Sequence, residues 1–229
     1  MVFIVSIYSQ SVSMARIIRG SRSLNSGFSL VELLVVLGVI SLLSAISLPY
    51  IINYKTRYKS EDQALKAMDL MREASQLALT RRRTFRFEID LTENAFLLID
   101  ENGADPDTLI KKIPIENANE VRVDRIPQSV AKPDPPNYAD ISFSVDSLGH
   151  LNGSTPVIGH STWSARFRSD GSAVNNSSVL INSNIYFWPP VSPGNVQART
   201  LGEVRAVTIS GGSGAIRYWK HDGTAFRPF

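Results

Sequence analysis

The chain has 229 residues, of which 43% are hydrophobic and 20% charged, and it contains no cysteine. This length suffices for one membrane helix and one modest soluble domain, and the lack of cysteine excludes disulfide bonds and thiolate chemistry. The net charge of +3 would favour an anionic partner, but Arg16, Arg19 and Arg22 lie in residues 1–27, which hold no acidic residue. The rest of the chain has 21 basic and 21 acidic residues, so the basic excess belongs to the N-terminal segment.

A long apolar run follows this basic segment. From Leu33 to Tyr54 there is no charged residue, and a helix of that length can cross a hydrocarbon core of about 30 Å. The positive-inside rule keeps the N-terminus cytoplasmic and places the residues after about 53 outside the cytoplasm. Glu32 stands at the start of the run. Because a carboxylate inside such a helix costs about 2.5–3.5 kcal/mol, it calls for a cationic partner.

Three interpretations compete for residues 1–52. A secretory signal peptide is too short for this run, and no small-x-small cleavage site follows it. A plain signal anchor explains the length and orientation but leaves Glu32 unexplained. Cleavage between Gly27 and Phe28 would create an α-ammonium one helical turn before Glu32, and such a buried pair penalises misaligned helices because an unpaired partner is costly. Either Met1 or Met14 can be the true start, since a compact basic leader begins at Met14.

The segment G-F-S-L-V-E-L at residues 27–33, followed by the apolar run and Pro49, resembles the class III signal of type IV pilins and type II secretion pseudopilins. The resemblance implies that a prepilin peptidase removes residues 1–27 and N-methylates Phe28, with S-adenosylmethionine as that enzyme's methyl donor. It implies that Glu32 pairs with the first residue of an adjacent subunit, and that Pro49 marks a helix kink. The implied partners are other major and minor pseudopilins or pilins, the inner-membrane assembly platform and membrane lipid.

The helix is predicted to continue through an amphipathic half, residues 54–83, after a transmembrane half, residues 28–53. A stripe of small residues and methionines recurs at spacings of three or four and faces away from a set of charged residues. The stripe consists of Ala64, Met68, Met71, Ser75 and Ala78. The lower half of the helix is therefore expected to pack on a sheet.

Residues 84–229 are predicted to form a β-rich globular head. "TFRFEIDL" alternates as a strand buried on one face, "AFLLID" closes a hairpin with it, and "ISFSV" alternates again. Residues 103–140 are rich in Pro, Asp and Asn and are expected to form a variable loop. The spacing of Phe167, Asp170 and Gly171 before a final hairpin around Gly-Gly-Ser-Gly is similar to GspH/FimT-like minor pilins. The predicted fold class is α+β, with one long N-terminal helix packed on antiparallel sheets.

No constellation in the sequence predicts catalysis or a cofactor. His150, His160 and His221 are scattered, and no phosphate-binding glycine loop opens a helix. "DENGADPD" at residues 100–107 gathers oxygen ligands of the kind calcium prefers, but Lys111 stands where an EF-hand-like loop would need a glutamate. An ordinary acidic turn is the alternative, and no metal site is predicted.

Nucleic acid is a second possible partner, because some FimT-like minor pilins bind DNA during uptake. The candidate residues are Arg217, Lys220 and Arg227, interleaved with Tyr218, Trp219 and Phe226 as a stacking platform would be. Arg81, Arg82 and Arg83 are instead expected to interact with the C-terminal end of the helix. The neutral balance of the mature chain argues against a nucleic-acid surface.

The sequence therefore predicts a structural protein and no enzyme: a minor pseudopilin that assembles into, and helps to initiate or cap, a type II secretion pseudopilus. The alternative is a type IV pilus minor pilin of FimT type. The predicted location is the inner membrane, single-pass, with a periplasmic head, and then the fibre. The run "IYFWPPVSP" at residues 185–193 is either a surface for contacts with other subunits or a strand that ends in a rigid loop.

Overall fold

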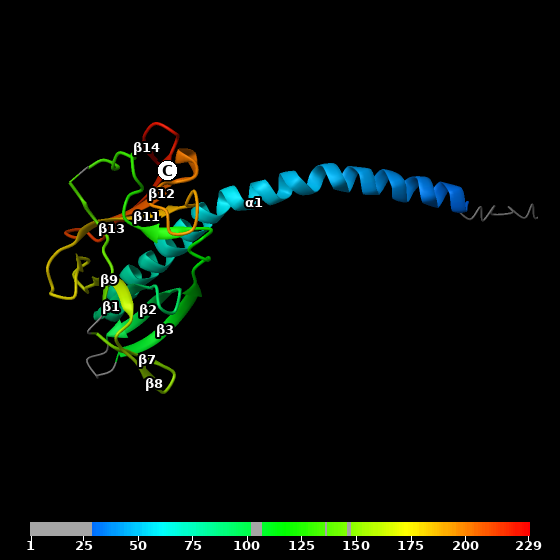
Figure 1. The fold of residues 1–229 in the computed structure, drawn as a ribbon. Coiled ribbons are helices and arrows are strands. Elements are labelled where there is room, and N and C mark those ends of the chain that lie inside the picture. The colour runs from blue at the N-terminus through cyan, green and yellow to red at the C-terminus, as the bar shows by residue number, and fades with distance from the viewer. Residues whose placement is uncertain (1–28, 102–106, 136, 146–147) are drawn as a thin grey trace, which may run out of the picture. The chain divides into compact units, whose positions relative to one another are not determined.

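The computed structural model describes residues 29–101, 107–135, 137–145 and 148–229, with side chains outside residues 48–57. One long α-helix and two β-sheets make up these parts, which confirms the predicted α+β class (Figure 1). The chain divides into two compact units, with the boundary between Ser47 and Leu48. The helix α1 runs from Leu30 to Arg81.

The first sheet has the strand order β10-β9-β1-β2-β3-β7-β8, with β6 also pairing with β9. Its neighbours β1 and β2 form the predicted antiparallel hairpin, and Figure 1 shows β9 next to β1 on the other side. The strands are β1 (Thr84–Asp90), β2 (Ala95–Glu101), β3 (Asp107–Pro114), β6 (Ser144–Val145), β7 (His150–Asn152), β8 (Thr155–Val157), β9 (Ser161–Phe167) and β10 (Ala173–Val174).

The second sheet has the order β14-β13-β12-β11-β4, with β5 also pairing with β11. Its strands are β4 (Arg122–Asp124), β5 (Ala139–Asp140), β11 (Asn182–Trp188), β12 (Arg205–Ser210), β13 (Ala215–His221) and β14 (Phe226–Pro228), and a 3-10 turn η1 (Leu201–Glu203) precedes β12. The hairpin predicted around Gly-Gly-Ser-Gly is confirmed as β12–β13.

The main core lies between α1 and the inner faces of both sheets. The predicted stripe contributes Ala64, Met68, Met71 and Ala78, which are all buried. Further core residues come from the same face of the helix, namely Ala67, Leu70 and Ala74. These mostly small side chains share one core with the aromatic rings of β1, β2 and β11.

The two sheets are joined at their glycine turns. The N–H of Ala173 in β10 donates to the carbonyl of Gly211, at the end of β12, at 2.8 Å. A Cβ built on Gly214, whose φ is +60°, would lie 2.3 Å from the carbonyl oxygen of Gly171. The turns predicted at Asp170-Gly171 and Gly-Gly-Ser-Gly are thus packed backbone against backbone.

Three sequence expectations differ from the structure. The strand predicted to be buried on one face, β1, is buried on both, because its polar residues lie under further chain on the outer face of the sheet. The segment 103–140 contains β3, where Leu109 packs on a small apolar cluster of β2. The run 141–145 forms a strand only at Ser144–Val145, since the chain crosses between the sheets after β5.

Candidate assembly site

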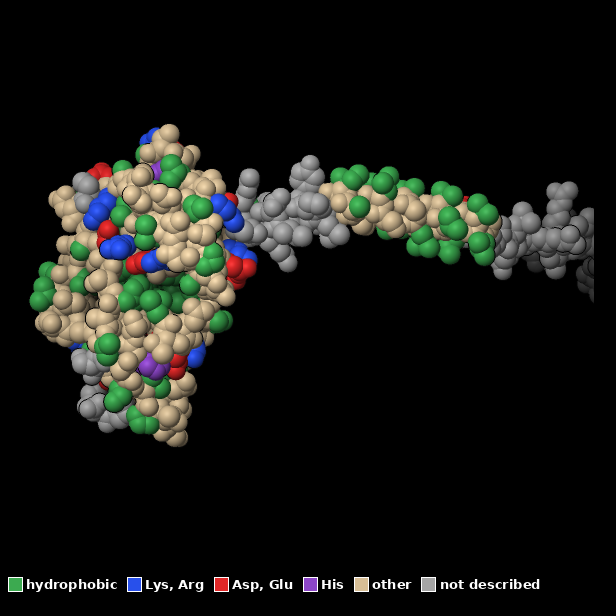
Figure 2. Space-filling view, viewed as in Figure 1, with side chains coloured by type: hydrophobic (Ala, Val, Ile, Leu, Met, Phe, Trp, Pro, Cys, Tyr) green, Lys and Arg blue, Asp and Glu red, His purple; other side chains and the backbone are tan. Residues whose placement is uncertain are grey.

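The helical segment from Leu30 to Ser47 is apolar on all sides. It has a mean hydropathy of 2.5, and its window is long and apolar enough to cross a membrane by length and composition. None of its residues is buried within the structure, and Figure 2 shows apolar side chains along it. A helix that is hydrophobic all round needs lipid or other helices around it. The segment therefore fits a membrane anchor.

Two of the three serine hydroxyls of this segment have partners within the helix. Ser41 Oγ donates to the carbonyl of Leu37 at 2.8 Å, and Ser47 Oγ donates to the carbonyl of Leu43 at 2.6 Å. Such bonds to the carbonyl four residues earlier satisfy a hydroxyl that has no water to bind. The two serines are thus compatible with an apolar environment.

The start of the helix is capped by Ser29. The backbone N–H of Glu32 donates to Ser29 Oγ at 3.2 Å, while the N–H of Leu33 donates to the Ser29 carbonyl at 3.1 Å. Ser29 is therefore the N-cap, and Glu32 is the third helical residue, as in a capping box. This explanation for Glu32 was missed by the sequence reasoning, although the pattern Ser-x-x-Glu at residues 29–32 signals it.

Glu32 also lies in the first helical turn, where the helix dipole favours a negative charge. Glu32 is exposed, and its carboxylate forms no ion pair with any residue that the structure describes. The predicted cleavage residues Gly27 and Phe28 lie outside the described residues. The backbone is helical through Pro49, whose side chain also lies outside the described set, so the predicted kink stays a prediction.

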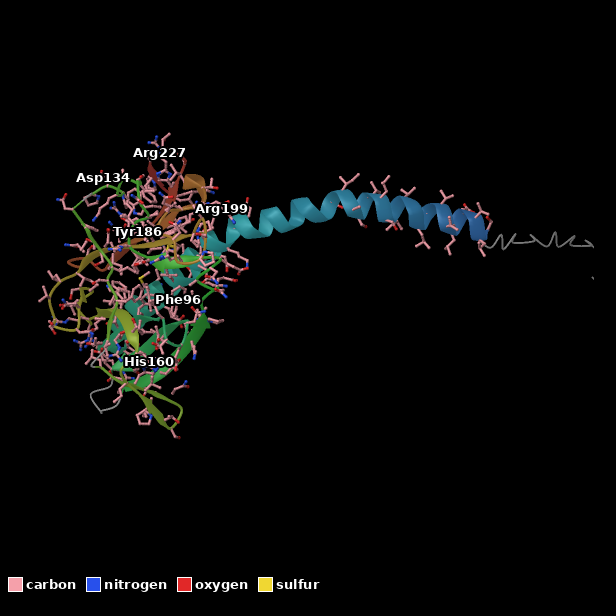
Figure 3. The ribbon with its side chains drawn as sticks, viewed as in Figure 1. Phe96, Asp134, His160, Tyr186, Arg199 and Arg227 are labelled. Atoms are coloured by element: carbon pink, nitrogen blue, oxygen red, sulfur yellow. The ribbon has the colours of Figure 1, made fainter. Side chains whose placement is uncertain are left out.

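The predicted DNA-binding residues do not form one surface. Arg217 and Lys220 differ by three positions in β13 and so face opposite sides of the sheet. Lys220 Nζ lies 3.4 Å from Glu61 Oε2 on α1, and Arg227, labelled in Figure 3, pairs through Nε with Asp222 Oδ2 at 3.0 Å.

The aromatic residues predicted to interleave with these cations are all buried: Tyr218, Trp219 and Phe226. Burial also raises the pKa of Tyr218 to about 12. The stacking platform predicted from the sequence is therefore wrong, because β13 buries side chains on both of its faces.

Glu61 ties the helix to the second sheet. Its carboxylate accepts from Arg205 Nη2 at 3.0 Å and lies close to Lys220. Partial burial raises the pKa of Glu61, but the hydrogen bonds and charges of Arg205 and Lys220 outweigh it and hold this pKa below its usual value. Nearby, buried Ser60 Oγ donates to the carbonyl of Glu203 at 2.7 Å. These polar contacts fix the register of α1 on the head.

The arginines at the end of α1 bind a carboxylate of β2. Asp100 Oδ2 lies 3.1 Å from Arg83 Nη2 and 3.8 Å from Arg81 Nη1, and both guanidinium groups lie within 6 Å of the Phe85 ring. Arg82 has a φ of +54°, the left-handed conformation that ends many helices. The three arginines thus lie at the C-terminal end of the helix, as predicted from the sequence.

The described carboxylates of the segment that was considered for calcium form ion pairs with arginines. Asp100 is held by the arginines, and Asp107 Oδ2 lies 3.4 Å from Arg86 Nη1. Asn102 and Asp105 lie outside the described residues. Within the described ranges, no group of three potential metal-ligating side chains is found.

Residues 185–193 form the end of the buried strand β11 and the loop that follows it. This agrees with the interpretation of the run as a strand that ends in a loop, and not as a contact surface. Ile185 and Phe187 belong to the main core, whereas Tyr186 and Trp188 belong to a second apolar cluster on the other face of the sheet. The expectation of a contact surface there is wrong for residues 185–190, because β11 is covered on both faces.

A buried polar network on the outer face of the first sheet was not predicted. Arg86 is fully buried and lies within 3.5 Å of three carboxylates, those of Glu88, Glu101 and Asp107. Its Nη2 also donates to the carbonyl of Gly149 at 3.0 Å. The alternation of charged and apolar residues in "TFRFEID" is equally consistent with a solvent-exposed polar face and with a buried polar network. Only the folded structure distinguishes these alternatives.

The comparison with family models finds the prokaryotic N-terminal methylation motif at residues 22–48. This match covers Ser29, Glu32 and the exposed apolar segment described above. No curated protein and no solved structure matches the chain significantly. The chain carries a type IV pilin-like signal.

The motif indicates a pilin-like protein or pseudopilin, a structural subunit that a prepilin peptidase processes and that assembles with other pilins. Such a subunit needs an apolar helix whose surface other helices can cover. The segment from Leu30 to Ser47 has that surface.

Proposed function

We propose that this protein is a minor pseudopilin that joins, and helps to initiate or cap, a type II secretion pseudopilus. The observation that carries the proposal is the exposed apolar helix whose first turn holds a single carboxylate beside its N-cap. In a fibre, neighbouring helices would cover this surface. The head would face outward, since it buries a hydrophobic core of its own.

The domain organisation follows from this proposal. Residues 1–27 are the leader that the peptidase removes, residues 28–53 the transmembrane half of the helix, residues 54–83 its amphipathic half and residues 84–229 the head. Cleavage after Gly27 and methylation of Phe28 place an N-terminal ammonium near Glu32. That ammonium, from an adjacent subunit, is the partner that the carboxylate lacks within the described residues.

The proposed location follows the same logic. The subunit waits in the inner membrane with its head in the periplasm, held by lipid around residues 30–47, and is then extracted into the fibre by the assembly platform. The network that joins Ser60 and Glu61 to the second sheet holds the head at a fixed register on the helix during this transfer.

Mass spectrometry of the N-terminal peptide tests the proposal. The full chain is expressed with and without the peptidase, and the peptide is expected to begin at Phe28 with one added methyl group only when the peptidase is active. A Gly27→Leu variant is the matched control and should keep its leader. An intact leader beside an active peptidase would contradict the assembly mechanism and leave a simple anchor.

A second experiment distinguishes a type II secretion pseudopilus from a type IV pilus. Deletion of the protein is expected to retain type II substrates in the periplasm while type IV pili persist. The opposite result would favour the alternative, a FimT-type minor pilin. A DNA mobility-shift assay tests the DNA-binding alternative. We expect no shift with the wild-type protein, because its exposed cations share no stacking surface. A shift that the Arg217→Ala and Arg227→Ala variants abolish would favour DNA binding.

A further inference from the structure

A pocket of about 290 Å³ lies between the outer face of the second sheet and the loop that joins β4 to β5. Thr208 and Trp219 are its buried lining residues, whereas Asp134 and Arg217 are exposed on its walls. Figure 3 labels Asp134 on this loop. The remaining lining residues are Pro135, Tyr138, Ser210, Ser213 and Ala215. The pocket is independent of the apolar helix segment on which the proposed function rests.

The lining side chains of β12 and β13 share one face of the sheet. In the antiparallel ladder, Thr208 lies directly opposite Arg217. Ser210 lies opposite Ala215 in the same way, and directly opposed residues point to the same face. Trp219 follows Arg217 by two positions and so shares this face. Because Trp219 packs in the second apolar cluster, this is the face turned away from the main core.

Hydrogen bonds hold the loop against this face. Tyr138 Oη donates to Ser210 Oγ at 3.2 Å. Lys132 Nζ donates to the carbonyl of Tyr138 at 3.0 Å and lies 2.9 Å from Asp140 Oδ1. Asp140 belongs to β5, which pairs with β11 and so joins the end of the loop to the sheet. These contacts hold the loop wall of the pocket against the strand wall.

The two charges on the pocket walls have no partner among the described residues. Neither the Asp134 carboxylate nor the Arg217 guanidinium forms a hydrogen bond or an ion pair with any residue that the structure describes, including each other. They are the only charged side chains of the described lining. Pro136, which follows Pro135 and lies outside the described residues, has no ionisable group. The pocket therefore presents one anion and one cation on opposite segments.

We propose that this pocket binds a small zwitterion of amino-acid size, with its carboxylate at Arg217 and its ammonium group at Asp134. A guanidinium can hold a carboxylate through two N–H groups, and a carboxylate accepts hydrogen bonds from an ammonium group. A ligand with one charge would pair with one wall and meet a like charge on the other, whereas a zwitterion pairs with both. The volume lies just below the range of about 300–1,000 Å³ for ligand pockets, so the ligand must be small.

The full-length protein, in an uncharged maltoside detergent, is titrated with glycine, alanine, serine and proline, and binding is followed by saturation-transfer difference NMR. Propionate and alaninamide carry only one of the two charges, and dialanine distinguishes a short peptide from a free amino acid. Arg217→Met and Asp134→Asn each remove one wall charge, and Ser213→Leu narrows the pocket at unchanged charge. Arg227→Met and Asp62→Asn are the matched controls, because these exposed charges do not line the pocket.

At least one amino acid is expected to bind saturably in the millimolar range or below, about tenfold or more tightly than propionate and alaninamide. The two charge variants and Ser213→Leu should each weaken binding about tenfold or more with unchanged circular dichroism, while both controls bind as the wild type does. Weaker binding of dialanine identifies a free amino acid, and equal or tighter binding identifies a short peptide. The proposal is overturned if no zwitterion saturates, if a one-charge analogue binds equally, or if either charge variant keeps the wild-type affinity.

Discussion

Ser29 and Glu32 are linked by a 3.2 Å hydrogen bond from the Glu32 backbone N–H to Ser29 Oγ, at the start of the exposed apolar helix. Glu32 can therefore have two separate roles, one through its backbone N–H and one through its carboxylate. The backbone of Glu32 belongs to the cap, whereas its carboxylate is the only charge in the segment from Leu30 to Ser47. Variants of the two residues therefore test capping and charge independently.

Glu32→Gln is expected to abolish incorporation into the fibre while leaving cleavage intact, because glutamine retains the shape but cannot pair with an ammonium. Ser29→Ala should reduce helix stability by about 1 kcal/mol, the usual cost of a lost N-cap, and still assemble. Fibre fractions sheared from cells and probed for the protein measure both outcomes. Normal assembly of the glutamine variant would refute the pairing role.

The two glycine turns give a test of the head. Gly214→Ala should destabilise the head by about 2 kcal/mol or more, because its Cβ would lie 2.3 Å from the Gly171 carbonyl oxygen and its φ of +60° disfavours a side chain. Gly212→Ala is the matched control, since a Cβ there meets nothing within 4 Å. Urea unfolding of the two variants compares them. Equal midpoints would show that the turns do not pack as described.

The sequence predicted the fold well where one periodicity dominates. The helix follows from an uninterrupted apolar run and then a stripe at a helical period, and β12–β13 from alternation around glycines. It failed where neighbours decide burial. Nothing local to Arg86 or Trp219 indicates that both faces of their strands are covered, because the covering chain comes from residues distant in sequence.

The candidate site shows the same division. The cleavage motif and Glu32 are readable because their chemistry lies within one helical turn. The predicted DNA platform failed because interleaved residues of a strand point to opposite faces, so Arg217 and Lys220 are separated by the sheet. The sequence also could not show that residues 163–165 of β9 pair with β1 alone, because this depends on where β6 and β10 stop pairing.

Arg86 should be the most costly cation to remove from the head. Arg86→Met leaves the carboxylates of Glu88, Glu101 and Asp107 without it, and removal of one partner from a buried ion cluster costs about 3–5 kcal/mol. Lys66→Met, which breaks an exposed pair with Asp62, should cost at most about 0.5 kcal/mol. Chemical denaturation measures both, and similar losses would contradict the assigned burial.

The stability of the head should fall as the pH is lowered from about 7.5 to about 5.5. Burial and then the charge of Arg86 hold the pKa of His150 below its usual value, although Asp90 and Glu93 oppose this, and burial also lowers the pKa of His221. Between the folded pKa and the unfolded value of about 6.5, the unfolded chain binds more protons, so the free energy of unfolding rises with pH in this window.

Thermal melting of the full chain across these pH values measures the effect. His150→Gln is neutral throughout and should flatten the dependence, with the remainder due to His221. His160, whose Nδ1 lies 2.5 Å from Asp90 Oδ2, is left unchanged in both proteins. A variant with the wild-type slope would show that His150 is not the buried neutral group that the structure describes.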